Sequence, residues 1–92
     1  MQPGDVVYSK AGRDRGRYFV VVEVCAEEGF VRVADGDIRR IKNAKRKNQK
    51  HLRPTGDRLE RIAAKLAEGA QVFDSELFSA LRLYGDKDRE NK

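Results

Sequence analysis

Eight basic residues and no acidic residue occupy positions 38–53 of this 92-residue chain, which carries a net charge of +5. Lysine and arginine bind phosphate oxygens, and arginine does so through a planar fork of donors. The flanking segments are each close to neutral, so this stretch predicts a patch for a polyanion on an otherwise balanced protein. The candidate anion-binding residues here are Arg39, Arg40, Lys42, Lys45, Arg46, Lys47, Lys50, His51 and Arg53.

A second basic segment lies nearer the N-terminus, and its cations are Lys10, Arg13, Arg15 and Arg17. We expect Gly12 and Gly16 to shape a loop here, because glycine turns sharply and has no side chain to keep a ligand away from the backbone. Tyr18 follows the loop and is either a core residue of the next strand or a platform on which an unpaired base stacks. Two basic segments on one small domain favour polyanion binding over a merely solvated charged loop.

Residues for catalysis or metal binding are sparse. His51 is the only histidine and Cys25 the only cysteine, so the chain lacks a histidine pair for a metal and a convincing nucleophile with its base. An acidic pair, Asp35 and Asp37, is explained by a turn and the start of a strand. The glycines of the first loop do not have the spacing of a phosphate-binding GxxxxGK[ST] loop. We therefore expect a protein that is not an enzyme and that needs no cofactor or metal.

The basic run 39–53 also fits other functions. Its triplet 45–47 resembles a nuclear-localisation signal, which short basic runs match by chance. Membrane binding is disfavoured, because the apolar residues of the run, Ile41, Ala44 and Leu52, form no amphipathic helix. Nucleic acid is the preferred polyanion.

The single cysteine also bears on location. It excludes an internal disulfide, which fits a reducing compartment, and we expect Cys25 to be a small buried hydrophobe. The N-terminus lacks a basic region followed by an apolar stretch, and the longest uninterrupted apolar run, residues 18–22, is too short to span a membrane. A cytoplasmic protein without membrane contact is therefore expected. A monomer is the expected oligomeric state, although these features do not determine it.

Short strands separated by turns fill the first part of the chain. We expect strands at residues 6–8, 18–24, 30–34 and 38–41, with a fifth near 50–52. Asp35-Gly36 predicts a two-residue hairpin turn of the primed type, which needs positive φ angles. Residues 18–24 are apolar on both faces apart from Glu23, which is typical of a strand buried between a barrel interior and an outer cover.

The apolar period becomes helical after residue 57. We expect one amphipathic helix from there to Gly69, with Thr55 or Asp57 as its N-cap, and a second from Asp74 or the next residue to Gly85. Their apolar residues are Leu59, Ile62, Ala63 and Leu66 in the first helix, and Leu77, Phe78, Leu81 and Tyr84 in the second. Both helices are expected to pack on the barrel.

The expected fold class is therefore α+β and mainly β. A small SH3-like β-barrel with a basic extension occupies residues 1–53, and a helical tail in residues 54–85 packs on it. Residues 86–92 are entirely polar and are expected to form a disordered tail.

Two parts of the sequence resemble known RNA-binding proteins. Residues 4–17, followed by a valine-rich strand, resemble the KOW motif of ribosomal proteins and transcription elongation factors. Residues 33–41, with Asp-Gly-x-x-Arg-Arg, and then 45–48 and 50–52 resemble bacterial KOW-domain RNA-binding proteins. These are similar to the archaeal and eukaryotic large-subunit ribosomal protein of the fourteen-e type. The resemblance covers roughly residues 3–53, and Ala44 stands where such proteins are expected to have proline.

This resemblance implies an SH3-like barrel that binds ribosomal RNA in a ribonucleoprotein and works in translation. It implies phosphate contacts from the arginines of the first loop, and it places His51 within the RNA-facing segment. The expected partners are RNA, with ribosomal RNA first, and ribosomal proteins.

Two other functions stay open on the sequence alone. A KOW barrel also serves as a protein-binding scaffold, so the apolar side of the second helix could dock a partner in transcription or translation. A small basic barrel can also bind duplex DNA as an architectural protein. A charge placed at Phe78 tests the first alternative, and the relative affinity for RNA and DNA duplexes tests the second.

Overall fold

The computed structural model describes residues 1–90, with side chains described up to residue 82. The five strands are β1 (Asp5–Ser9), β2 (Tyr18–Val24), β3 (Phe30–Ala34), β4 (Lys45–Asn48) and β5 (Leu52–Arg58). They form one antiparallel sheet in the order β4-β3-β2-β1-β5. The short 3-10 helices η1 (Ile41–Asn43) and η2 (Gln49–His51) precede β4 and β5, and the α-helices α1 (Glu60–Glu68) and α2 (Asp74–Glu90) follow the sheet.

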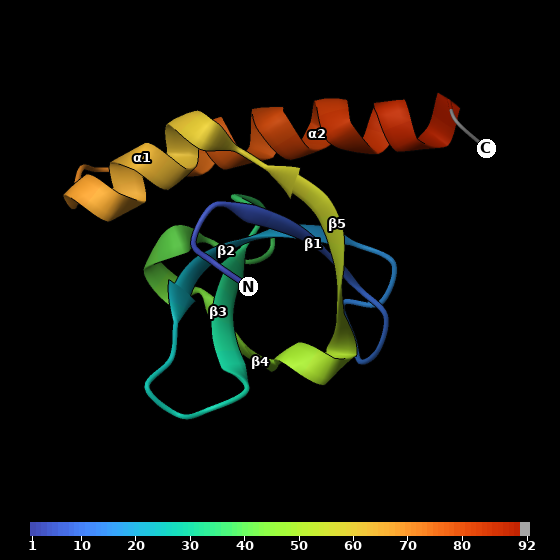
Figure 1. The fold of residues 1–92 in the computed structure, drawn as a ribbon. Helices are drawn as coiled ribbons and strands as arrows, with labels where there is room; N and C mark the ends of the chain where they lie inside the picture. The colour runs from blue at the N-terminus through green and yellow to red at the C-terminus, as the bar shows by residue number, and fades with distance from the viewer. Residues whose placement is uncertain (91–92) are drawn as a thin grey trace.

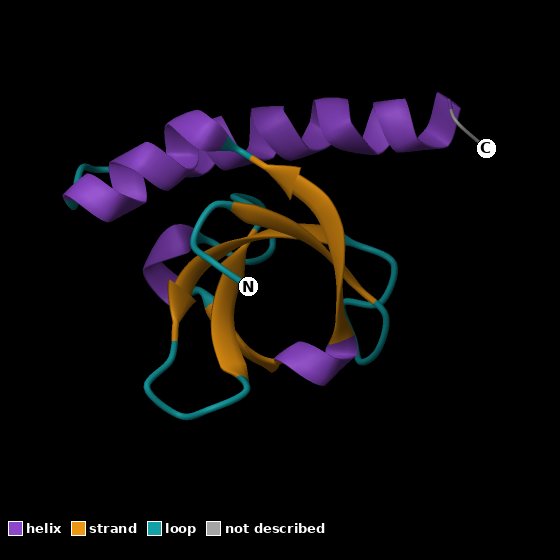
Figure 2. Ribbon diagram, in the orientation of Figure 1, coloured by secondary structure: helices purple, strands orange, loops and turns teal. Residues whose placement is uncertain are grey.

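The sheet curls almost into a ring, with α1 and α2 lying across its outer side (Figure 1). The ring is not closed, because β4 and β5 are its two edge strands and η2 joins them (Figure 2). Strand twist and register shifts within the β1–β5 and β2–β3 pairs accompany this strong curvature. The α+β class is therefore confirmed, whereas the barrel is an open, curled sheet.

Two hydrophobic clusters share the strands. The cluster on the concave side of the sheet consists of Val7, Phe19, Val21, Val31, Val33 and Leu52. The cluster between the sheet and the helices consists of Val6, Val20, Ala34, Ile62, Leu77 and Leu81. Successive residues of β1 and β2 alternate between the clusters, because successive side chains of a strand point to opposite faces. The predicted burial of both faces of β2 is confirmed for residues 19–21, whereas Glu23 and Val24 are exposed.

The helix α1 starts later than predicted. Its N-cap is Leu59 rather than Thr55 or Asp57, because β5 continues through both of those residues. The predicted end at Gly69 is confirmed: Gly69 has a φ of 72° and its N–H donates to a carbonyl of the last turn.

The helix α2 is longer than predicted. It begins at Asp74, as expected, but it passes Gly85 and ends at Glu90. Residues 86–90 of the predicted disordered tail are therefore helical in the structure, and residues 91–92 lie outside the described part of the chain.

The apolar side of α2 is mainly a core surface. Leu77 and Leu81 are buried in the cluster between the sheet and the helices, whereas Phe78 is 43% exposed. The side chain of Tyr84 lies outside the described residues. Two of the four residues that the adaptor alternative assigns to partner docking therefore stabilise the fold instead.

The connection from β3 to β4 is a long loop rather than the predicted tight hairpin. Residues 38–40 are irregular and residues 41–43 form η1, so the predicted strand at 38–41 is wrong. The side chain of Asp35 organises this loop, since its Oδ1 accepts hydrogen bonds of 2.9 Å from the N–H groups of Asp37 and Arg39. Asp35 does not have the positive φ that the predicted turn requires at both central positions. The chain therefore turns around the Asp35 carboxylate.

This loop forms the docking site of α2 at Gly36. A Cβ atom at position 36 would lie 2.0 Å from the carbonyl oxygen of Asp74 and 2.9 Å from the backbone nitrogen of Phe78. The Asp74 carboxylate also accepts a 2.8 Å hydrogen bond from the N–H of Ile41. The start of α2 therefore holds the loop that carries the first residues of the basic run.

A hydrogen-bonded carboxylate links the two helices. Glu76 accepts hydrogen bonds from the Lys65 ammonium and from the N–H of Phe73, and both lower the pKa of its carboxyl group. The carboxylate therefore stabilises the fold above the ordinary pKa of glutamate, and this stabilisation is lost as the pH falls through the lower, folded-state value. We expect Glu76→Gln to make the free energy of unfolding less dependent on pH in the acid range, as measured by urea unfolding. The control is Glu68→Gln, on the exposed face of α1, and an unchanged pH dependence for Glu76→Gln would contradict this role.

Candidate nucleic-acid interface

The loop between β1 and β2, residues 10–17, brings the two basic segments together. The N–H of Lys10 donates a 3.1 Å hydrogen bond to the carbonyl of His51 in η2. The Lys47 ammonium of β4 donates a 3.3 Å hydrogen bond to the carbonyl of Ala11. The first loop therefore lies against the second basic segment at two points.

A network of ion pairs joins the same loop to the β3–β4 connection. Asp14 is buried, and its carboxylate accepts hydrogen bonds of 3.0 and 3.3 Å from the Arg39 guanidinium. Arg17 lies 3.7 Å from the Asp35 carboxylate and 3.5 Å from that of Asp37. A buried carboxylate without a positively charged partner is strongly destabilising. The Arg39 guanidinium therefore stays paired with Asp14. The sequence predicted these arginines as free anion-binding groups, whereas the structure gives them carboxylate partners.

Neighbouring basic residues of β4 have different surroundings. The Arg46 guanidinium lies 3.9 Å above the centre of the Phe30 ring and pairs with the Glu27 carboxylate. Both contacts hold the side chain in place, and the Glu27 carboxylate offsets its charge. Lys45 is exposed and forms no ion pair with a described residue. The predicted basic triplet is therefore not a uniform cationic patch.

The third residue of the triplet, Lys47, is only 8% exposed. It pairs in register with Val31, so its side chain points to the concave side of the sheet. Its ammonium donates hydrogen bonds to the Ser9 hydroxyl at 3.1 Å and to the carbonyl of Ala11. These bonds connect edge strand β4 to the end of β1 across the open side of the sheet. Lys47 therefore stabilises the curled sheet and is withdrawn from the outer surface.

We expect Lys47→Ala to lower the free energy of unfolding by about 2–4 kcal/mol, because it removes two hydrogen bonds and leaves a cavity. Lys45→Ala, on the same face of β4 but exposed, should cost less than about 0.5 kcal/mol. Urea unfolding of the two variants measures both values. A similar, small cost at both positions would show that the Lys47 ammonium does not form these bonds.

Nine of the thirteen predicted binding residues are exposed and form no ion pair with a described residue. They are termed the basic surface and comprise Lys10, Arg13, Arg15, Arg40, Lys42, Lys45, Lys50, His51 and Arg53. Lys42 of η1 lies on the other side of the ring from the first loop and η2, close to Leu66 of α1 (Figure 1). The other four are the paired Arg17, Arg39 and Arg46 and the buried Lys47. Cations without carboxylate partners repel one another, and a polyanion relieves this repulsion.

Two glycines of the first loop adopt backbone conformations that other residues rarely reach. Gly12 and Gly16 have φ angles of 84° and 89°, in the left-handed region that favours glycine. Ala44, where proline was expected, has φ −55° and ψ 138°, which proline can also adopt. The backbone conformation at position 44 therefore suits alanine and proline alike.

Two aromatic rings support one edge of the basic surface. Tyr8 and Tyr18 pack edge to face, with ring centres 5.2 Å apart and planes at 62°. The Arg53 guanidinium lies 4.7 Å above the centre of the Tyr8 ring. Tyr18, at the start of β2, therefore packs against Tyr8 of β1 next to the first loop.

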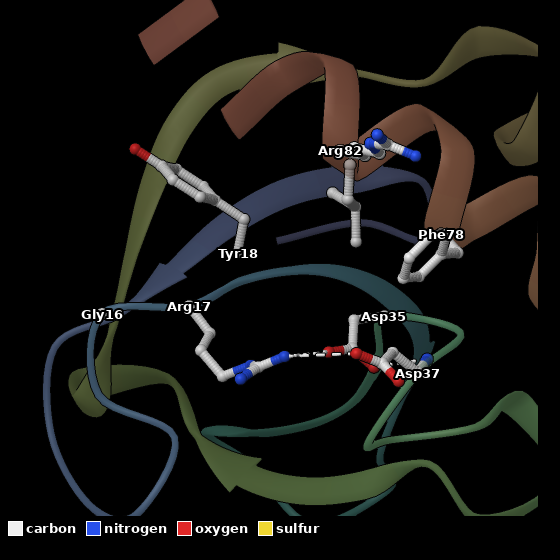
Figure 3. A pocket seen from close by; sticks show the side chains of 8 residues that line it. Gly16, Arg17, Tyr18, Asp35, Asp37, Phe78 and Arg82 are labelled. Carbon is white, nitrogen blue, oxygen red and sulfur yellow. Dashed lines mark hydrogen bonds and ion pairs between the residues drawn. The ribbon is translucent and has the colours of Figure 1, made fainter. Parts of the chain in front are cut away.

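A pocket of about 280 Å³ lies where the first loop, the β3–β4 connection and α2 meet (Figure 3). Its lining consists of Gly16, Arg17, Tyr18, Asp35, Asp37, Phe78, Leu81 and Arg82. The sequence did not point to Asp37, Phe78 and Arg82 as members of one site. The docking of α2 at Gly36 brings them together, and no local pattern indicates that contact.

Comparisons with known proteins assign no family: no family model matches the chain, and no curated protein matches it significantly. Among the described residues, no group of three or more histidine, cysteine, aspartate or glutamate side chains could hold a metal ion. Within the same part of the chain, every helix is too short or too polar to cross a bilayer. The basic surface and the adjoining pocket carry the functional interpretation.

Proposed function

We propose that this chain is a noncatalytic, cytoplasmic RNA-binding protein that holds the phosphate backbone of a structured RNA. The observation that carries the proposal is the basic surface, whose nine exposed basic side chains form no ion pair with a described residue. Phosphate contacts dominate the affinity of such surfaces, and each contact releases counterions. Binding is therefore expected to weaken steeply as salt rises.

The surface is held in shape before any ligand binds. Hydrogen bonds from Lys10 to His51 and from Lys47 to Ala11 fix the first loop against β4 and η2. The pair of Arg39 with the buried Asp14 fixes it against the β3–β4 connection. Such preorganisation reduces the conformational entropy that binding would otherwise cost.

RNA is favoured over duplex DNA by the pocket beside the basic surface and by the sequence resemblance. Sequence-specific RNA recognition mostly uses unpaired bases in loops and bulges, which a pocket can accept. The curled sheet with helices on its outer side is compatible with an SH3-like barrel of the KOW type. We therefore propose ribosomal RNA as the target and ribosomal proteins as neighbours, with a role in translation.

Fluorescence anisotropy tests the proposal with a labelled RNA hairpin, an RNA duplex and a DNA duplex, each across a range of salt concentrations. We expect the hairpin to bind most tightly and log Kd to rise linearly with log salt. Labelled polyglutamate serves as the control for a polyanion that is not a nucleic acid. Equal affinity for the two duplexes would favour an architectural DNA-binding protein, and no binding to RNA at low salt would overturn the proposal.

Sedimentation of a native lysate through sucrose gradients tests the link to the ribosome. We expect the protein to migrate with the large ribosomal particle at low salt and to leave it at high salt, with crosslinks on one stretch of ribosomal RNA. If the protein stays at the top of the gradient without enriched RNA, a protein-binding adaptor becomes the better hypothesis.

A further inference from the structure

We propose that the pocket between the first loop, the β3–β4 connection and α2 binds one unpaired guanine base of the RNA held on the basic surface. This inference rests on the proposed function and adds a base-specific contact to it. The pocket volume of about 280 Å³ is close to the lower limit of small-molecule sites, roughly 300 Å³. A single base fits such a pocket, whereas a base pair within a duplex does not.

The polar floor of the pocket consists of one arginine and two carboxylates. Arg17 extends across the floor towards Asp35 and Asp37 (Figure 3). Oδ1 of Asp35 already accepts two backbone hydrogen bonds, and its side chain is almost fully buried. The Asp37 side chain is 53% exposed, and its contact is with Arg17 at 3.5 Å. Asp37 therefore has acceptor capacity left for a ligand, and the partly exposed guanidinium of Arg17 has donors left beside it.

This pair of side chains complements the Watson–Crick edge of guanine. The Arg17 guanidinium offers donors, and the neighbouring Asp37 carboxylate offers two acceptor oxygens. Guanine presents its O6 acceptor beside two adjacent donors, N1–H and the N2 amino group. O6 can therefore accept from Arg17 while the two donors face the Asp37 carboxylate. Adenine, cytosine and uracil do not place an acceptor beside two adjacent donors. A carboxylate can accept hydrogen bonds from both guanine donors at once, as it accepts two from an arginine guanidinium.

Aromatic side chains line the walls of the same pocket. Phe78 is 43% exposed and is absent from both hydrophobic clusters, although its neighbours on α2 belong to one of them. An exposed ring at the wall of a pocket provides a flat surface on which a base can stack. Tyr18 lines the pocket from the strand side.

The surroundings of the pocket suit a base that is part of an RNA chain. Arg82 lines the pocket from α2, and Arg13 and Arg15 of the basic surface lie in the same loop as Arg17. A nucleotide bound here therefore has further basic residues close to it that can contact the phosphates of its strand. A free guanine nucleotide offers the same base, but the sequence has no GxxxxGK[ST] loop for its phosphates.

A set of RNA hairpins that differ only in one unpaired nucleotide tests the proposal by fluorescence anisotropy. We expect the guanine hairpin to bind about tenfold more tightly than the adenine, cytosine and uracil hairpins, as for other bidentate base contacts. Asp37→Asn should reduce this preference to within about twofold, because one acceptor becomes a donor. It should lower the affinity for the guanine hairpin and raise that for the other three slightly, because it removes both a guanine contact and a negative charge. The control Asp57→Asn removes an exposed carboxylate of β5 that does not line the pocket, and it should keep the guanine preference.

Phe78→Ala gives an independent test of the stacking surface. We expect it to weaken binding of the guanine hairpin about tenfold. The matched control is Phe73→Ala, which removes a similarly exposed ring, 54% exposed, that does not line the pocket. Thermal unfolding of each variant should match that of the wild type, since both rings are exposed.

The outcomes separate this inference from the proposed function. Equal affinity of the wild type for all four hairpins, with salt-dependent binding retained, would overturn the guanine pocket and leave RNA binding intact. No binding to any hairpin at low salt would overturn both. Competition by free guanosine monophosphate at the affinity of the guanine hairpin would assign the pocket to a nucleotide and overturn its role in RNA recognition.

Discussion

Alanine at Arg13, Arg15 and Lys50 together should weaken binding of an RNA hairpin by about 10²-fold near ~0.1 M salt. The three side chains come from both basic segments and are exposed without an ion pair to a described residue. Each phosphate contact contributes roughly 0.7–0.9 to the slope of log Kd against log salt, so the slope should fall by about 2. The free energy of unfolding should change little, because no buried contact is removed.

The matched control removes the same charge from elsewhere on the molecule. Arg32, Arg58 and Arg61 are exposed and lie outside the basic surface, and the first two pair with Glu23 and Asp5. Alanine at all three should lower the slope by less than about 1, the value expected for one contact. Anisotropy titrations across a salt range measure both variants. Equal losses would show that RNA responds to net charge alone, and the basic surface would then not be the interface.

Alanine at Gly36 should lower the free energy of unfolding by at least about 3 kcal/mol. The φ of 78° is strained for any residue with a side chain, and the new Cβ would lie 2.0 Å from the carbonyl oxygen of Asp74. The start of α2 must therefore move away from the sheet. This movement would expose Leu77 and Leu81, and loss of a buried leucine contact typically costs about 2–5 kcal/mol. Urea unfolding followed by circular dichroism measures the change.

Alanine at Gly29 separates backbone strain from the clash with α2. Gly29 has a φ of 88°, but a Cβ there would meet no atom within 4 Å. Its cost should therefore be limited to about 1–2 kcal/mol of backbone strain. Similar losses for Gly29→Ala and Gly36→Ala would show that the contact between Gly36 and α2 is unimportant.

Strands with strong local signals were predicted accurately. The predicted bounds of β2 and β3 agree with the structure, because valine-rich runs there are separated by glycine-containing turns. β4 was missed because its sequence, Lys-Arg-Lys-Asn, has no apolar alternation. β4 forms by backbone pairing with β3, and the side chain of Lys47 lies on the concave face of the sheet. β5 was largely missed because it contains Pro54 and Gly56, which an edge strand tolerates.

The charge pattern found the basic residues but not their partners. The pairing of Arg39 with Asp14 joins two loops that are distant in sequence, so no spacing rule indicates it. The burial of Lys47 likewise depends on the curl of the sheet, which brings the end of β1 over β4. The sequence therefore located the candidate interface, whereas the structure distinguishes exposed cations from those that stabilise the fold.

The central claim is that the basic surface contacts RNA, and chemical-shift mapping of the ¹⁵N-labelled chain with an RNA hairpin tests it most directly. We predict that amide shifts concentrate in residues 10–17 and 40–53 and decline as salt is raised, while α1 and the 25–29 loop change little. Shifts that concentrate on α1 instead, or a spectrum that RNA leaves unchanged at low salt, would contradict the account.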